Sequence, residues 1–570
     1  RLQELPFRAA ESNAMSTQRL ASALLASLAI AGCSLNEDQV PAPQPAPPVA
    51  PARAESRAQD LALAREIAPA SAAYLPAPMP CCVLPPEDRE NYAHQDENPV
   101  HLASEQPVST FSVDVDTGAY ANVRRFLNGG AMPPADAVRV EEMLNYFAYA
   151  YPAPDSTRQP FSVTTALAPA PWNAGKVLLQ VGLRGYEVPA ARRAPANLVF
   201  LVDVSGSMQD EDKLPLLKSA FRLMTGQLKA TDRVALVVYA GAAGVVLEPT
   251  AGSEVARIRA ALDRLEAGGS TNGEGGIRLA YDLARTGFIE GGINRIVLAT
   301  DGDFNVGTTD FDALVDLVKR ERAGGVSLTA LGFGTGNYND ALVEQLADAG
   351  NGNHAYIDTL AEARKVLVEQ LSGTLQTIAK DVKVQVEFNP AQVAEYRLIG
   401  YENRGLRRED FNNDRVDAGD IGAGHTVTAL YELVLTDSPA RLVDPLRYGA
   451  QPTAATGGPA AEIAHVRLRY KAPDGDASRL IEQPVLRASL KPLEALPAER
   501  GRDLRFAAAV AAFGQKLRGS DYLDRYDYPE IIALATAGRG PDPDGYRAEF
   551  IGLVKLAEAL APVGEPQVRR

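Results

Sequence analysis

The chain has 570 residues, a length that corresponds to about three or four domains. Of these residues 46% are hydrophobic and 23% are charged, which is typical of globular proteins. Its net charge is -15 and it has no dense run of Lys or Arg, which argues against nucleic-acid binding because that needs a basic face. The three cysteines, Cys33, Cys81 and Cys82, are too few for a disulfide scaffold and lack the spacing of a zinc site.

The first apolar segment runs from Leu20 to Ala31 and follows Met15 and Arg19. It is too short to span a bilayer, which takes about 20 residues, but it has the length of the apolar core of a secretory signal peptide. Residues 1–14 are therefore expected to be upstream sequence or the product of a start assigned too early.

This apolar segment ends in Ile30-Ala31-Gly32-Cys33, which resembles the lipobox of bacterial lipoproteins. The resemblance implies that residues 1–32 are removed and that Cys33 is the lipidation site, with several acyl chains forming a stable membrane anchor. A plain secretory signal with a chance cysteine is the alternative. Ser34 stands where an Asp would signal retention in the inner membrane. We therefore expect a lipid-anchored protein of the cell envelope, in the outer membrane, facing the periplasm or the cell surface.

Residues 33–95 are rich in Pro and Ala. This composition cannot bury a core and favours extended polyproline II structure, so the segment is predicted to be a tether that packs poorly against the rest. Cys81 and Cys82 lie within it as free thiols or as a strained vicinal disulfide, and their redox state stays open.

A small N-terminal α+β module is predicted over residues 96–195, with a turn at Asp116-Thr117-Gly118. Its expected elements are a strand at Ser109–Val115, helices at Tyr120–Leu127 and Val140–Phe147, and strands at Phe161–Leu167 and Lys176–Leu183.

Buried strands alternate with helices over residues 196–375, which indicates a doubly wound, mainly parallel α/β sheet covered on both faces. The expected strands are Asn197–Asp203, Arg233–Tyr239, Arg295–Thr300, Ser327–Phe333 and His354–Ile357. The expected helices are Lys213–Leu228, Glu254–Leu265, Gly275–Arg285, Leu314–Arg322, Leu342–Ala349 and Leu360–Leu375.

Residues 376–570 are predicted to be a β-rich region closed by helices. The strands are expected at Val382–Phe388, Thr426–Leu435 and Ala464–Tyr470, and the helices at Arg502–Leu517, Tyr528–Thr536 and Gly545–Leu560.

Oxygen-bearing side chains follow three strands or loops of the predicted α/β domain: Asp203-Val204-Ser205-Gly206-Ser207, Gly268-Gly269-Ser270-Thr271-Asn272 and Thr300-Asp301-Gly302-Asp303. Ligands of open α/β sheets bind at the carboxyl ends of the strands. Carboxylates and hydroxyls without His or Cys favour a hard cation, so the expected ion is Mg²⁺, with Mn²⁺ or Ca²⁺ as substitutes.

These three segments, on a doubly wound pattern, resemble the metal-ion-dependent adhesion site (MIDAS) of von Willebrand factor A domains, which are Rossmann-like. The resemblance covers residues 196–375. It implies that the metal is held, directly or through water, by Asp203, Ser205, Ser207, Thr271 and Asp301.

The wider order of segments resembles the bacterial YfbK family of A-domain lipoproteins over roughly residues 98 to 560. The resemblance is carried by the lipobox, the Pro-rich tether, Phe111-Ser112-Val113-Asp114-Val115-Asp116-Thr117, Asp417-Ala418-Gly419-Asp420 and Tyr470-Lys471-Ala472-Pro473-Asp474-Gly475-Asp476. It identifies neither a partner nor a role for the C-terminal region.

Other polar patterns have simpler explanations. Asp114 and Asp116 lack the remaining ligands of an EF-hand, so capping of the next helix is favoured over a calcium site. Asp414, Asp417 and Asp420 fit a polar turn better than a second metal site. His354 and His425 are expected to be ordinary strand or loop residues, and Trp172 a packing residue. Gly332-Phe333-Gly334-Thr335-Gly336 lacks the spacing of a dinucleotide fingerprint.

The function expected from these features is binding, not catalysis: a protein partner donates an Asp or Glu carboxylate to the bound ion. The alternatives are a structural subunit of the envelope whose metal holds loops in place, or a metal-dependent hydrolase, for which the sequence offers no general base beyond the ligands. Partner identity, metal occupancy, oligomeric state and switching between open and closed states stay open.

Overall fold

The computed structural model describes residues 89–561, except 114, 157, 304–310, 371–372, 374 and 445–460. All of these residues belong to one compact unit, Cys82–Arg570. The expectations for the signal peptide, Cys33, Cys81, Cys82 and Asp114 lie outside the described residues. No helix within the described part of the chain is long and apolar enough to cross a membrane.

A six-stranded sheet forms the centre of the α/β domain, in the order β10-β9-β8-β5-β6-β7. All neighbours are parallel except β6 and β7, so the predicted doubly wound, mainly parallel sheet is confirmed. Its strands are β5 (Ala196–Asp203), β6 (Arg233–Tyr239), β7 (Ala243–Ala251), β8 (Ile293–Thr300), β9 (Ser327–Phe333) and β10 (His354–Ile357).

Helices cover both faces of this sheet because the central strand β5 is apolar on both sides. Leu198, Phe200 and Val202 pack into one core with α3, α4 and α8, whereas Val199 and Leu201 pack into another with α5, α6 and α7. The helices are α3 (Leu214–Thr225), α4 (Val255–Asp263), α5 (Gly273–Thr286), α6 (Phe311–Arg322), α7 (Asp340–Ala349) and α8 (Leu360–Arg364).

The long helix expected over Leu360–Leu375 is wrong. The α-helix ends at Arg364 and a π-helical turn follows over Lys365–Glu369. In this turn the buried ammonium of Lys365 donates a hydrogen bond to the carbonyl of Tyr146 (2.8 Å). That bond ties the end of the α/β domain to the rest of the chain.

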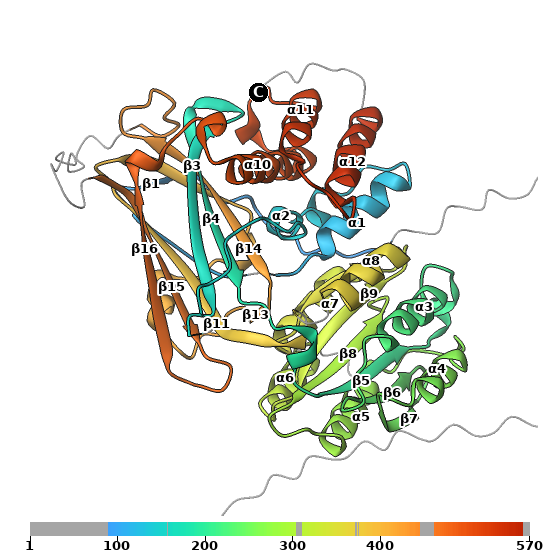
Figure 1. Cartoon of the computed structure of the whole chain (residues 1–570). Helices are drawn as coiled ribbons and strands as arrows, with labels where there is room; N and C mark the ends of the chain where they lie inside the picture. The colour runs from blue at the N-terminus through green and yellow to red at the C-terminus, as the bar shows by residue number, and fades with distance from the viewer. Residues whose placement is uncertain are drawn as a thin grey trace, which may run out of the picture. The chain divides into compact units, whose positions relative to one another are not determined.

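Two antiparallel sheets surround a second core, formed by segments that precede and follow the α/β domain in the sequence (Figure 1). One has the order β1-β12-β14-β4-β3, and the other has the order β13-β11-β15-β16 with β2 also paired to β11. The strands are β1 (His101–Leu102), β2 (Val108–Ser112), β3 (Phe161–Ala170), β4 (Asn173–Gly185), β11 (Thr377–Phe388), β12 (Val393–Ile399), β13 (Ile421–Gly422), β14 (Thr426–Leu435), β15 (Glu462–Lys471) and β16 (Ser478–Leu486).

The segments expected as separate regions, 96–195 and 376–570, thus share their sheets. Strand β4 pairs with β14 from Val177 to Arg184, because a hairpin of β3 and β4 alone would leave one long edge of β4 without hydrogen-bond partners. We call these two segments together the flanking body. Sequence alone gave no sign of this pairing, which joins residues about 250 positions apart.

The predicted closing helices are present and pack with the N-terminal helices into a third core against the sheet that contains β4. These helices are α1 (Gly118–Asn128), α2 (Val140–Asn145), α10 (Ala498–Arg518), α11 (Tyr528–Gly538) and α12 (Tyr546–Leu560). The predicted end of the tether at residue 95 is too late, since Asn91 already forms a parallel β-bridge with Asn339 of the α/β domain.

Candidate functional site

Two buried carboxylates end neighbouring strands of the central sheet. Asp203 is the last residue of β5, and Asp301 directly follows β8. The two strands are parallel with Val202 opposite Ala299, so both carboxylates lie at the same end of the sheet, and both are fully buried. Asp203 accepts hydrogen bonds from the backbone amide of Ser205 (2.8 Å) and the hydroxyl of Thr300 (3.2 Å).

The predicted hydroxyl ligands lie on two loops that hydrogen bonds hold together. The hydroxyls of Ser205 and Ser207 lie 2.9 Å apart across a short 3₁₀ turn. Backbone bonds join the second loop to the first, from Gly206 N to Gly269 O (3.0 Å) and from Gly268 N to Val204 O (2.7 Å). Gly269 has a φ of +89°, which a residue with a Cβ rarely adopts. Thr271 follows this turn and is buried.

These contacts bring the three predicted segments to one end of the sheet. Burial, together with the neighbouring carboxylate of Asp301, raises the pKa of Asp203 to about 6. Two ionised carboxylates here repel one another in a poorly solvated site, which a cation would relieve.

Lys213 is a site residue that the sequence analysis missed. Its buried ammonium donates to Oδ2 of Asp301 (3.2 Å) and to the amide oxygen of Asn337 (2.7 Å). Asn337 in turn donates to the same Asp301 oxygen (2.9 Å). The Lys213 side chain passes over Gly334, where a Cβ would approach its Cε to 2.1 Å. The glycine run noted in the sequence therefore makes room for a lysine, a use that only the fold reveals.

The donor set fits a hard divalent cation, because it offers two carboxylates and three hydroxyls at one end of the sheet. Within the described ranges, no group of three or more His, Cys, Asp or Glu side chains is arranged to hold a metal ion. The candidate site is of another kind, since hydroxyls supply most of its donors. Asp203, Ser205, Ser207, Thr271 and Asp301 would hold the ion.

The polar residues for which the sequence favoured no metal-binding or catalytic role have structural partners. Asp116 accepts from the backbone of His354 (2.8 Å) and from Arg404 (3.1 Å). The capping role expected for it is wrong: α1 has no side-chain cap at Thr117, and Glu142 accepts from the amide of Ala119 (2.8 Å) instead.

The acidic turn in the flanking body is also paired. Asp414 bonds Arg469 (3.0 Å), Asp417 pairs with Arg322 (2.6 Å), and Asp420 accepts from the amide of Asp381 (3.2 Å).

His354 lies 2.8 Å from the hydroxyl of Tyr338, and Trp172 donates to Glu432 (2.5 Å). His354 and His425 both line a cavity of about 540 Å³.

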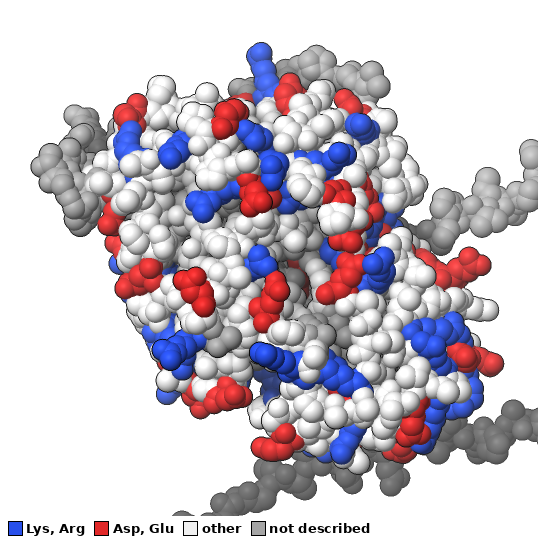
Figure 2. All heavy atoms as spheres, viewed as in Figure 1, with Lys and Arg blue, Asp and Glu red and all other residues white. Residues whose placement is uncertain are grey.

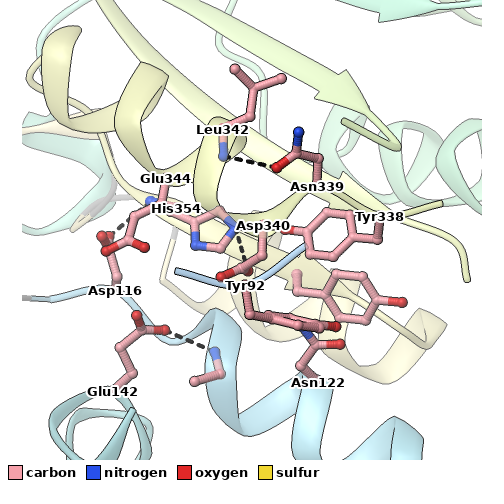
Figure 3. Close-up of polar contacts among 12 residues, drawn as sticks. Tyr92, Asp116, Asn122, Glu142, Tyr338, Asn339, Asp340, Leu342, Glu344 and His354 are labelled. Atoms are coloured by element: carbon pink, nitrogen blue, oxygen red, sulfur yellow. Dashed lines mark hydrogen bonds and ion pairs between the residues drawn. The ribbon is translucent and has the colours of Figure 1, made fainter. Parts of the chain in front are cut away.

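A buried charged cluster joins the α/β domain to the flanking body next to the candidate site. Asp340, the first residue of α7, pairs with Arg139 at the start of α2 (2.5 Å), and Arg139 also bonds Glu142. Figure 3 shows His354 joined to both Asp340 and Asp116, with Glu142 below them accepting from a backbone amide at the start of α1. On the molecular face in Figure 2, basic and acidic side chains are interspersed, so that face offers no extended basic surface for nucleic acid.

Three family models match consecutive parts of the chain: "von Willebrand factor" over residues 86–180, "von Willebrand factor type A domain" over 197–370, and "Uncharacterized protein YfbK, C-terminal" over 373–560. The chain is 49% identical over 480 residues to the uncharacterized protein YfbK of Escherichia coli K12, covering 83% of this chain and 82% of that protein.

More distant similarities concern shorter or less similar proteins. The chain is 31% identical over 172 residues to the uncharacterized protein sll0103 of Synechocystis, covering 30% of this chain and 40% of that protein. A solved von Willebrand factor type A protein from Catenulispora acidiphila aligns with 69% of this chain and 89% of its own, at 17% identity and a TM-score of 0.38. By its extended identity to YfbK and its central domain, the chain belongs to the YfbK family of proteins with a von Willebrand factor type A domain.

Proposed function

We propose that this protein is a membrane-anchored, extracytoplasmic binding protein that engages a protein partner through a metal-ion-dependent adhesion site. Asp203, Ser205, Ser207, Thr271 and Asp301 hold the ion, with Mg²⁺ favoured over Mn²⁺ or Ca²⁺ by the all-oxygen donor set. A bound ion would supply an open coordination position for an Asp or Glu carboxylate of the partner. A-type domains are in general protein-interaction modules, which agrees with this proposal.

The observation that carries the proposal is the pairing of two buried carboxylates at the ends of β5 and β8. Unpaired buried charge is unfavourable, and these two acids also repel each other. The ammonium of Lys213 compensates the negative charge of Asp301, but its hydrogen bonds go to Asp301 and Asn337 and not to Asp203. A divalent cation between Asp203 and Asp301 would compensate both carboxylates.

The contacts of Lys213 and Asn337 with Asp301 support a second candidate function, that of a structural subunit of the envelope. Lys213 and Asn337 already fix Asp301, so an ion could serve mainly to hold the loops together. A metal-dependent hydrolase is a weaker alternative, since the proposed ligands would have to serve as the general base as well. We assign no catalytic residue.

A co-precipitation experiment separates these functions. The full chain is immobilised and incubated with envelope extract in Mg²⁺ or in EDTA, with Asp203→Ala as the site variant. Asp263→Ala, which removes an exposed carboxylate of α4 paired with Arg222, is the control. We expect a partner retained in Mg²⁺ by wild type and control, and lost in EDTA or with Asp203→Ala. A partner retained by Asp203→Ala in EDTA would support the structural alternative and contradict the adhesion site.

Membrane anchoring is proposed from the sequence alone. Acylation of Cys33 would place the described part of the chain outside the cytoplasm, at the end of the Pro- and Ala-rich segment 33–95. The outer membrane is favoured by Ser34. Fractionation of cells that express wild type or Cys33→Ser tests this assignment.

A further inference from the structure

The segment Arg89–Tyr92 runs alongside the loop Gly334–Asn339, which connects β9 to α7. The hydrogen bonds between them join Arg89 N to Gly336 O (2.9 Å), Asn91 N to Tyr338 O (2.9 Å) and Asn91 Nδ2 to Asn339 Oδ1 (3.2 Å). The segment thus adds a short parallel bridge to this loop. We call it the strap.

The other side of the same loop contacts the proposed metal site. Backbone groups of Gly336 and Tyr338 bond the strap, and the residue between them, Asn337, directs its side chain to Asp301. Its amide fixes Oδ2 of Asp301 at 2.9 Å, and the backbone amide of Asn339 lies 3.4 Å from the Asp301 carbonyl oxygen. The loop therefore lies between the strap and a proposed metal ligand.

Glu90 anchors the strap to the flanking body. One of its carboxylate oxygens accepts from the backbone amide of Gly336 (2.8 Å) and from Arg125 of α1 (3.0 Å). The other pairs with Arg125 at 2.7 Å, and the Glu90 side chain is only 4% exposed. Tyr92 continues the strap towards Asp340 at the start of α7 (Figure 3).

The loop depends on such support because of its own sequence. Gly334 and Gly336 have φ values of +81° and +86°, a region that glycine enters easily and leaves easily. Without the strap, these glycines would let Asn337 move away from Asp301. Of these two donors to Oδ2 of Asp301, only Lys213 would then remain in place, and its positive charge opposes that of an incoming cation.

We propose that the strap regulates the metal site: bound along the Gly334–Asn339 loop, it holds Asn337 and Asp301 in the metal-binding arrangement, and its release weakens cation binding. Glu90 is a positioning residue in this scheme. The inference rests on the proposed adhesion site and adds a regulatory connection between the metal and α1 of the flanking body. Because coupling is reciprocal, cation binding also strengthens the contact of the strap with the loop.

The test measures Mg²⁺ affinity of the full chain by calorimetry and strap protection by amide hydrogen exchange. Glu90→Ala removes the anchor, and Asn91→Pro removes the amide that bonds Tyr338 while leaving Glu90 in place. Glu549→Ala is the matched control, because it breaks an ion pair of the adjacent α1 residue Arg124 (2.9 Å) away from the loop. Outer-shell partners of metal ligands typically change affinity about 10- to 100-fold.

We expect both strap variants to bind Mg²⁺ about tenfold more weakly than wild type, with Glu549→Ala unchanged. We also expect the amides of Asn91 and Gly336 to exchange more slowly in Mg²⁺ than in EDTA in the wild-type protein. Wild-type affinity in both strap variants would overturn the strap proposal and leave the metal site standing. A wild-type protein that bound no Mg²⁺ would overturn the metal site and the strap proposal together.

Discussion

Replacing Asp203 by Asn removes one of the two repelling carboxylates and keeps the shape of the side chain. In the metal-free protein, burial and the nearby Asp301 raise the pKa of Asp203 from 3.8 to about 6. This shift of roughly two units corresponds to a penalty of about 3 kcal/mol on the ionised side chain at neutral pH. The asparagine oxygen can still accept from Ser205 N, although neutral hydrogen bonds are weaker than charge-assisted ones.

We therefore expect Asp203→Asn to increase the unfolding free energy of the EDTA-treated protein by about 1–2 kcal/mol at pH 7.5. Since a raised carboxyl pKa means that the native state holds its proton more tightly, wild type loses stability as pH rises from about 4 to 6. The advantage of the variant should grow over that window and stay constant above it. At a hundredfold excess of Mg²⁺ over its dissociation constant, wild type should gain about 2.7 kcal/mol and the variant nothing.

The assay is thermal and denaturant unfolding of both proteins, at pH 5 and 7.5, in EDTA and in Mg²⁺. A variant less stable than wild type in EDTA at pH 7.5 would refute the electrostatic reasoning. A variant that kept the full Mg²⁺ shift would show that the ion binds elsewhere, as it would for Asp203→Ala.

Three further changes have outcomes that follow from the residues involved. Ser205→Ala should weaken Mg²⁺ binding while leaving the melting temperature in EDTA nearly unchanged, because a neutral hydroxyl adds little repulsion; a large drop in EDTA would contradict this. Burial and the charge of Arg295 lower the pKa of His425 to about 4, so this neutral imidazole should make the fold lose stability as pH falls from about 6.5 to 4, and His425→Gln should flatten that part of a stability–pH profile. Cys33→Ser should abolish palmitate labelling and release the protein from membranes; unchanged labelling would disprove lipidation at this residue.

The central sheet could be predicted because its strands are buried on both faces. Such strands are continuous apolar runs, and an Asp directly after the run places a carboxylate at the sheet edge. Strand β5 shows this pattern over its whole length. The candidate ligands were therefore visible as residue types at strand ends, whereas the contact of Lys213 with Asp301 depends on the path of a long side chain over Gly334.

Strands that break the apolar pattern could not be predicted. Strand β12 buries the charged residues Glu395 and Arg397, whose partners Leu442 N and Gln515 come from distant parts of the chain. Strand β16 is half exposed and contains Pro484, and β7 is a half-exposed edge strand. Their pairing is set by neighbours that local periodicity does not reveal.

The most direct test of the proposed metal site is calorimetric titration of Mg²⁺ into the metal-free full chain, compared with Asp301→Ala. The five-residue site predicts one saturable Mg²⁺ site per wild-type chain and none in the variant. Equal binding by wild type and Asp301→Ala, or no binding by wild type, would contradict the assignment of Asp203, Ser205, Ser207, Thr271 and Asp301 as the metal ligands.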